Sequence, residues 1–131
     1  MSIWQLSWNF KNYDAIGRMA AASTSEDAKH LSQSWGRSPI TNISKIKVGD
    51  TIYISCQKKC IGKAVITREF YPVDDIKLDE FTHNQSEHSK RHDNRWYCDI
   101  YITDIYTLED QQDLRGNQKT FCNPTKAFWK K

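Results

Sequence analysis

Two tryptophans and their polar neighbours are the residues of this sequence best suited to hold a nucleobase. Trp35 lies in a stretch rich in Gly, Ser and Pro, with Arg37 two residues on. A base can stack on an indole while a guanidinium contacts the adjoining phosphate. Trp8 and Asn9 stand at the end of an expected first strand, and the Asn amide can pair with a base edge. Two alternatives stay open: Trp35 plugs the end of a barrel, and Asn9 caps a helix beside a core Trp8.

Two polar clusters are candidates for phosphate contact. Lys58 and Lys59 lie at the tip of an expected hairpin, where they are exposed on almost any fold. Arg115, Asn117 and Lys119 form a second cluster in a turn near the end of the chain. Either cluster can equally be a solvated turn that only maintains solubility.

The charge of the chain is distributed unevenly. The net charge is only +3, which permits nucleic-acid binding without requiring it. Residues 35–70 carry seven basic side chains against two acidic ones, a local charge of +5, and residues 74–80 are acidic. A surface polarised in this way favours an anionic partner on one side. A solvated face without a partner is the alternative.

The four cysteines raise the questions of a metal site and of a catalytic nucleophile. Cys56 and Cys60 are separated by three residues across the hairpin tip, but the histidine spacings match no compact zinc finger. Cys98 with a histidine could form a nucleophile pair, and Asp99 or Asp104 could act as a base. No sequence feature brings a nucleophile, a base and oxyanion donors together. We therefore expect no metal, no cofactor and no catalytic residues.

The length and hydropathy of the chain set broad limits. The 131 residues fit one domain, 1–131, with a single core. No apolar run approaches the roughly 20 residues that span a bilayer, and the N-terminal residues lack the features of a signal peptide. We expect an intracellular protein, cytoplasmic or nuclear, whose cysteines are thiols in a reducing compartment.

Strand patterns surround a central hairpin. Residues 48–70 contain two runs rich in β-branched and aromatic residues around a polar break, which predicts an antiparallel hairpin with Gly62 at a close approach or bulge. Residues 3–8 predict a first strand with Trp4 and Leu6 in the core. Residues 96–106 predict the longest strand, with Cys98, Ile100 and Ile102 facing the core.

The intervening segments predict short helices and loops. Asn12 or Asp14 can cap a helix over residues 13–22, and a second short helix is expected to reach Leu31. Residues 40–46 suit a single helical turn, residues 82–95 a mobile loop, and Asn123-Pro124 the start of a final helix. This order predicts an α+β fold: a small mixed or antiparallel β-barrel of five to six strands flanked by short helices.

The order of these residues resembles the PUA-like superfamily, and within it the EVE and YTH branches. One shared feature is a first strand that ends in Ser7-Trp8-Asn9-Phe10 before a helix. Another is residues 46–50, IKVGD, leading into IYI at 52–54 and CIGKAV at 60–65. The third is Arg95-Trp96-Tyr97 at the opening of a long strand.

The resemblance implies a β-barrel with a nucleobase pocket at one rim. In EVE and YTH domains this pocket is aromatic, and many members recognise a modified base in RNA or DNA. By position, Ser7, Trp8 and Asn9 match the end of the first strand, and Trp35 matches the tryptophan in the loop before the hairpin. Trp96 closes the loop 82–95, which holds histidines where a second cage tryptophan would be expected. The base and its modification therefore stay open.

These features together predict a non-catalytic reader of nucleic acid, either RNA or modified DNA. One flipped or single-stranded base would lie between Trp8, Trp35 and the barrel rim, with Arg37, Lys58 and Lys59 at the flanking phosphates. Two alternatives remain: a nuclease or nucleoside-amide hydrolase of the ASCH kind, and a protein-interaction module that uses its aromatic surface. We expect no membrane partner, and the oligomeric state is left open.

Overall fold

The computed structural model describes residues 2–8, 13–34, 45–57, 59–72, 80–82, 96–107, 109 and 112–113. Its elements are, in chain order, β1 (Ile3–Trp8), α1 (Ala15–Thr24), the 3-10 helix η1 (Asp27–Lys29), β2 (His30–Ser34), β3 (Thr51–Cys56), β4 (Lys59–Pro72), β5 (Trp96–Ile105) and β6 (Gln112–Asp113). Neither helix in these ranges has the length and apolar character needed to cross a membrane.

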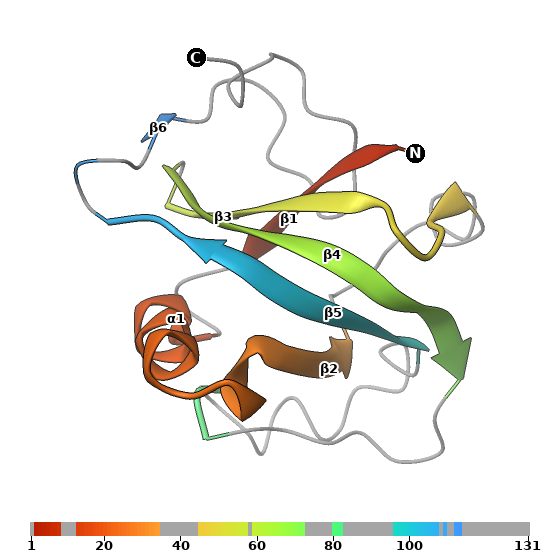
Figure 1. Cartoon of the computed structure of the whole chain (residues 1–131), viewed down its shortest axis with the longest axis horizontal. Coiled ribbons are helices and arrows are strands. Elements are labelled where there is room, and N and C mark those ends of the chain that lie inside the picture. The colour runs from red at the N-terminus through yellow and green to blue at the C-terminus, as the bar shows by residue number, and fades with distance from the viewer. Residues whose placement is uncertain are drawn as a thin grey trace.

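The six strands form one mixed sheet (Figure 1). The strand order is β1-β3-β4-β5-β2, and β6 pairs with β4 outside this path. β1 runs parallel to β3, whereas the other neighbours are antiparallel. This confirms a mostly β fold of mixed strands with a short helix. Within the described residues no ladder joins the edge strands β1 and β2, so the predicted closure into a barrel is not confirmed.

The predicted hairpin is the centre of the sheet. β3 and β4 pair antiparallel from Thr51↔Val65 to Cys56↔Lys59. The register shifts between Ile54↔Gly62 and Ser55↔Cys60, which leaves Ile61 as an extra residue on β4. A bulge of this kind changes which side chains share a face. It lets Ile61 enter the core together with Ala64, although alternation would place them on opposite faces.

The hydrophobic core lies between α1 and one face of the sheet. Ile52 and Ile54 of β3 and Cys98, Ile100 and Ile102 of β5 are buried on this face, as the alternation of these strands predicts. α1 presents Ala15, Met19 and Ala22 to the same core. The Asp14 side chain accepts the Gly17 N–H at 3.0 Å and caps the helix, which confirms one of the two predicted caps.

Two sequence predictions about the strands are wrong. The segment expected to be helical up to Leu31 instead forms η1 and then β2, which pairs with β5 at the edge of the sheet. The longest strand is β4, with 14 residues, and not the strand that begins at Trp96, which has 10. The predicted turn at 40–46 is described only near its end, where Ile46 is buried. Residues 83–95 and the predicted final helix lie outside the described residues.

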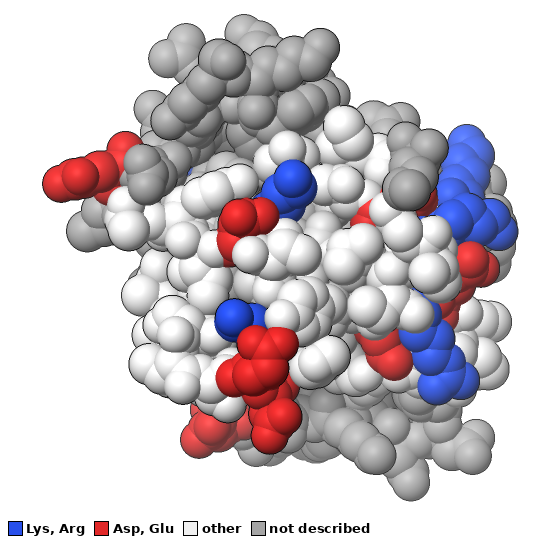
Figure 2. Space-filling model, viewed as in Figure 1, with Lys and Arg blue, Asp and Glu red and all other residues white. Residues whose placement is uncertain are grey.

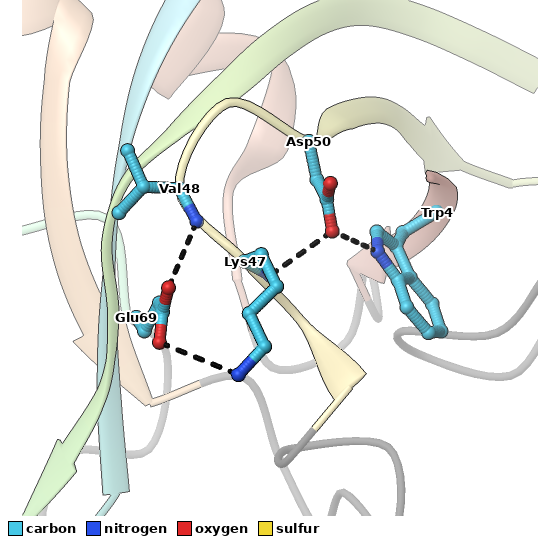
Figure 3. Close-up of polar contacts among 5 residues, drawn as sticks. All are labelled: Trp4, Lys47, Val48, Asp50 and Glu69. Atoms are coloured by element: carbon cyan, nitrogen blue, oxygen red, sulfur yellow. Dashed lines mark hydrogen bonds and ion pairs between the residues drawn. The ribbon is translucent and has the colours of Figure 1, made fainter. Parts of the chain in front are cut away.

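Asp50 ties the beginning of β1 to the turn before β3 (Figure 3). The Asp50 side chain is 3% exposed and accepts three hydrogen bonds. The donors are the Trp4 indole N–H at 2.9 Å and the Lys47 N–H at 3.0 Å, both drawn in Figure 3. The third donor is the Ser2 N–H at 3.0 Å. Burial alone would raise the pKa of Asp50, but these hydrogen bonds outweigh it and lower the pKa below its usual value. The contact fixes where β1 begins against β3, and with it the strand end that carries Trp8.

Candidate functional site

The predicted pocket begins where β1 and β3 end side by side. Because the two strands are parallel, Ser7 lies opposite Ser55 and Trp8 lies opposite Cys56. The Ser7 and Ser55 hydroxyl oxygens are 2.9 Å apart, and the Ser55 hydroxyl donates to the Leu6 carbonyl at 3.3 Å. The Gln5 amide donates to the Ser7 oxygen at 3.5 Å. This strand end therefore carries a connected set of hydroxyl and amide groups, of which sequence reasoning identified only Ser7.

Trp8 is in the core. Its side chain is 7% exposed. The Tyr13 ring packs against it with centroids 5.0 Å apart and planes inclined by 32°. The Trp8 indole is thus part of the core at this end of the sheet, and the Tyr13 ring covers one of its faces. The sequence left open whether Trp8 is a core residue, and its burial supports that alternative.

Trp96 lies at the other end of the sheet. It is 47% exposed and pairs with Pro72, the last residue of β4. Trp8 lies beside Cys56, whose partner is Lys59, the first residue of β4. The whole length of β4 therefore separates the two tryptophans, and the structure does not bring them into one site.

Lys59 is the predicted phosphate contact that the structure places near Trp8. Its side chain is exposed at the start of β4, opposite Cys56 at the end of β3. The other predicted site residues lie outside the described residues: Asn9, Trp35, Arg37, Lys58, Arg115, Asn117 and Lys119.

Charges of both signs share the surface in view. Figure 2 shows Lys and Arg side chains next to Asp and Glu on this face, without a large patch of one sign. Lys47, a basic residue of the hairpin region, has an acidic partner, because its Nζ lies 3.8 Å from Glu69 Oε1 (Figure 3). The other carboxylate oxygen of Glu69 accepts a hydrogen bond from the Val48 N–H. Such a surface favours local contacts over long-range attraction of a polyanion.

A second polar cluster, which the sequence did not predict, lies on the sheet face opposite the core. Ser32 of β2, Asp99 of β5 and Arg68 of β4 are cross-strand partners in one row. Both the Ser32 hydroxyl and the Tyr71 hydroxyl donate to Asp99 Oδ1, the latter at 2.6 Å. In the described part of the chain, no donor reaches Asp99 Oδ2. We call Ser32, Arg68, Tyr71 and Asp99 the sheet-face cluster.

A second bulge brings Arg68 into the sheet-face cluster. Ile66 pairs with Ile100, and Arg68 pairs with Asp99. Between these two pairs β4 has one residue more than β5, and this extra residue is Thr67. Ile66 is buried in the core, whereas Arg68 is exposed on the opposite face, with its guanidinium carbon 3.7 Å from the centre of the Tyr71 ring. Bulges often re-aim a side chain beside a functional site. Alternation along β5 could have placed Asp99 on this face, but no sequence signal gives the register that adds Arg68.

Tyr71 holds its proton within this cluster. Burial raises the pKa of Tyr71, and its hydrogen bond to Asp99 raises it further. The hydroxyl therefore remains a donor to Asp99 Oδ1 at neutral pH and fixes the orientation of the carboxylate.

The described cysteines are buried thiols. Burial raises the pKa of Cys98 to about 12 and that of Cys60 to about 11, so both thiols are protonated at neutral pH. Burial also raises the pKa of Cys56. No group of three or more His, Cys, Asp or Glu side chains within the described ranges is arranged to hold a metal ion.

Comparison of the sequence with protein-family models gives no match, and comparison with curated proteins gives none either. Among solved structures, the chain is similar to protein PSPTO5229 from Pseudomonas syringae, with 18% identity and a TM-score of 0.47 over 80% of this chain and 70% of that one. It is also similar to Rpa0253 from Rhodopseudomonas palustris, with 16% identity and a TM-score of 0.45 over 84% and 69%. It is similar as well to a hypothetical protein from Leishmania major, with 16% identity and a TM-score of 0.43 over 83% of this chain and 71% of that one. Similarity at this level carries no argument about function.

Proposed function

We propose that this chain is a non-catalytic reader of nucleic acid that holds one base of a single strand at the end of β1. In this proposal the mixed sheet belongs to a small PUA-like β-barrel of the EVE/YTH kind, and the base lies at its rim. Trp35 provides the stacking surface, and Ser7 and Asn9 contact the base edge. Lys58, Lys59 and Arg37 meet the flanking phosphates.

The observation that carries the proposal is the joint ending of β1 and β3. It places the half-buried Ser7 hydroxyl at this strand end, held by the buried Ser55 hydroxyl, and the exposed Lys59 lies at the start of the adjoining β4, in the row of Trp8 and Cys56. A hydroxyl group donates and accepts, so Ser7 can pair with any base edge, and a lysine at the same end of the sheet suits a phosphate. Trp8 and Tyr13 pack together in the core on the other face of this strand end.

The chemistry of the described residues supports binding over catalysis. A cysteine nucleophile needs a lowered pKa, whereas the pKa values of Cys60 and Cys98 are raised to about 11 and 12. These values count against a hydrolase that uses Cys60 or Cys98 as its nucleophile.

Binding of fluorescent single-stranded RNA and DNA, with and without modified bases, tests the proposal. We expect Trp35→Ala to weaken binding about fivefold or more, because stacking of one base on an aromatic side chain is worth about 1–3 kcal/mol. Lys59→Ala should weaken binding of all sequences alike and reduce the salt dependence by about one phosphate contact. The matched control is Lys29→Ala, which removes a lysine from η1, outside this strand end.

Equal binding by wild type, Trp35→Ala and Lys59→Ala would contradict the proposed site. The absence of binding to any oligonucleotide at low salt would contradict the proposed function itself.

A further inference from the structure

The sheet-face cluster presents an ordered row of hydrogen-bonding groups across three strands. Ser32, Asp99 and Arg68 lie side by side because they are cross-strand partners on β2, β5 and β4. Ser32 uses its proton on Asp99 Oδ1, and its oxygen, which lies 3.4 Å from the Tyr71 hydroxyl, keeps a lone pair with which to accept. Asp99 Oδ2 is a second acceptor, and the Arg68 guanidinium is a donor. The row thus reads acceptor, acceptor, donor.

The orientation of this row is fixed by the protein. The Tyr71 hydroxyl donates to Asp99 Oδ1 at 2.6 Å, alongside the Ser32 hydroxyl, and together they direct Oδ2 away from themselves. The Arg68 guanidinium lies over the Tyr71 ring, with its central carbon 3.7 Å from the ring centre. A cation held on an aromatic ring in this way keeps its N–H groups available. Among the residues that the structure describes, no carboxylate forms an ion pair with Arg68 and no cation forms one with Asp99.

We infer that the sheet-face cluster binds the Watson–Crick edge of an unpaired guanine in single-stranded nucleic acid, an inference that rests on the proposed function. Guanine presents an amino donor, an imino donor and a carbonyl acceptor in that order. These complement the Ser32 oxygen, Asp99 Oδ2 and the Arg68 guanidinium. Cytosine offers guanine the same acceptor, acceptor, donor sequence in a base pair.

The other bases do not complement the row. Adenine places a ring acceptor where Asp99 Oδ2 needs a donor, and cytosine does the same with a ring nitrogen. Uracil has a single donor between two acceptors. A buried or half-buried acceptor that faces another acceptor loses affinity, because neither group is then hydrogen-bonded. The cluster is therefore expected to discriminate by base identity, whereas the strand end at Ser7 contacts a base separately.

Asp99→Asn is the most informative substitution, because the neighbouring Ser32 and Tyr71 hydroxyls determine the orientation of the new side-chain amide. The Ser32 and Tyr71 hydroxyls donate to the Oδ1 position, so they select the amide oxygen there and turn the amide NH₂ to the Oδ2 position. A donor then faces the imino donor of guanine. The variant should lose its preference for guanine and favour a base with a ring acceptor at that place.

The experiment compares short pyrimidine oligonucleotides that carry one central guanine, inosine, 7-deazaguanine or adenine, with an all-pyrimidine strand as reference. Wild type should bind the guanine strand about tenfold more tightly than the adenine strand and about fivefold more tightly than the inosine strand, which lacks the amino donor. It should bind 7-deazaguanine like guanine, because the Watson–Crick edge is unchanged. Asp99→Asn should abolish the guanine preference. The matched control is Asp104→Asn, an exposed carboxylate on the same strand.

Each outcome separates this inference from the proposed function. Equal affinity of wild type for all the strands overturns the guanine site and leaves nucleic-acid binding intact. No affinity for any strand overturns both. A guanine preference that survives Asp99→Asn also overturns the site. If thermal melting shows that Asp99→Asn is unfolded, Ser32→Ala replaces it, and this variant should bind the guanine and inosine strands equally.

Discussion

At the scale of single residues, the hydrogen bonds of Asp50 lead to a prediction about the free energy of unfolding. Its buried carboxylate accepts hydrogen bonds from Trp4, Lys47 and Ser2, so Asp50→Ala would leave three donors without their acceptor. A buried group left without its hydrogen bond costs about 1–3 kcal/mol. We expect the free energy of unfolding, measured with urea, to fall by about 1–3 kcal/mol, mainly because the Trp4 indole N–H is buried whereas the Ser2 and Lys47 hydrogen bonds are only partly buried. Asp104→Ala, at an exposed site, should change it by about 0.5 kcal/mol or less.

The lowered pKa of Asp50 also leads to a prediction about how stability depends on pH. The pKa of Asp50 is lower in the folded protein than its usual value, so the carboxylate stabilises the fold above the unfolded pKa of about 4. This contribution is lost as the pH falls through the lower folded pKa. The stability difference between wild type and Asp50→Asn should therefore be largest at neutral pH and shrink below about pH 4. A difference that is constant down to acid pH would contradict the role of the charged carboxylate.

Single residues also show what the sequence could reveal of the site. Ser7 and Trp8 could be placed at a strand end because alternation and the following polar residues mark it. Ser55 could not be recognised as the partner of Ser7, because that contact depends on the parallel register of β1 and β3. The sheet-face cluster was missed for the same reason: a bulge at Thr67 decides that Arg68 faces Asp99.

At the scale of elements, the strands with strong patterns were predicted, whereas β2 and the two-residue β6 were not. β1, the β3–β4 hairpin and β5 carry β-branched and aromatic residues in alternation, and all of them form. β2, with the sequence HLSQS, has one aliphatic residue and no alternation of its own. Pairing with β5 makes it a strand, which is a tertiary effect that local sequence does not encode.

The packing of α1 on β4 gives a prediction at this scale. A Cβ at Gly62 would lie 2.2 Å from Met19 Cε of α1 and 2.8 Å from the Asp104 backbone oxygen of β5. Met19 can move, but the backbone of β5 cannot do so without disturbing the sheet. We expect Gly62→Ala to lower the free energy of unfolding by about 1–3 kcal/mol, as measured by urea denaturation.

The neighbouring half-buried site provides the control for that substitution. Lys63→Ala should have a much smaller effect than Gly62→Ala, since the Lys63 side chain lies on the opposite face. A Gly62→Ala protein as stable as wild type would mean that α1 and β5 are less tightly packed against this strand than the distances indicate.

At the scale of the whole molecule, strand order predicted a mixed or antiparallel sheet of five to six strands with short helices at its side, and the structure confirms a mixed sheet with a short helix. Closure into a barrel depends on which edges meet, and this cannot be derived from the pattern of any one strand. The same limit applies to the site. Trp8 and Trp96 both belong to strand ends, but the antiparallel course of β4 and β5 places them at opposite ends of the sheet.

The most direct test of base binding at the end of β1 is an NMR titration of the isotope-labelled protein with an all-pyrimidine single strand, which avoids any guanine site. We predict that the backbone amides of Ser7, Ser55 and Lys59 and the indole N–H of Trp35 shift in a saturable, salt-sensitive way. The indole N–H of Trp4, held by Asp50 at the opposite end of β1, should remain unchanged. Shifts confined to the Trp4 end, or none at all, would contradict the proposal.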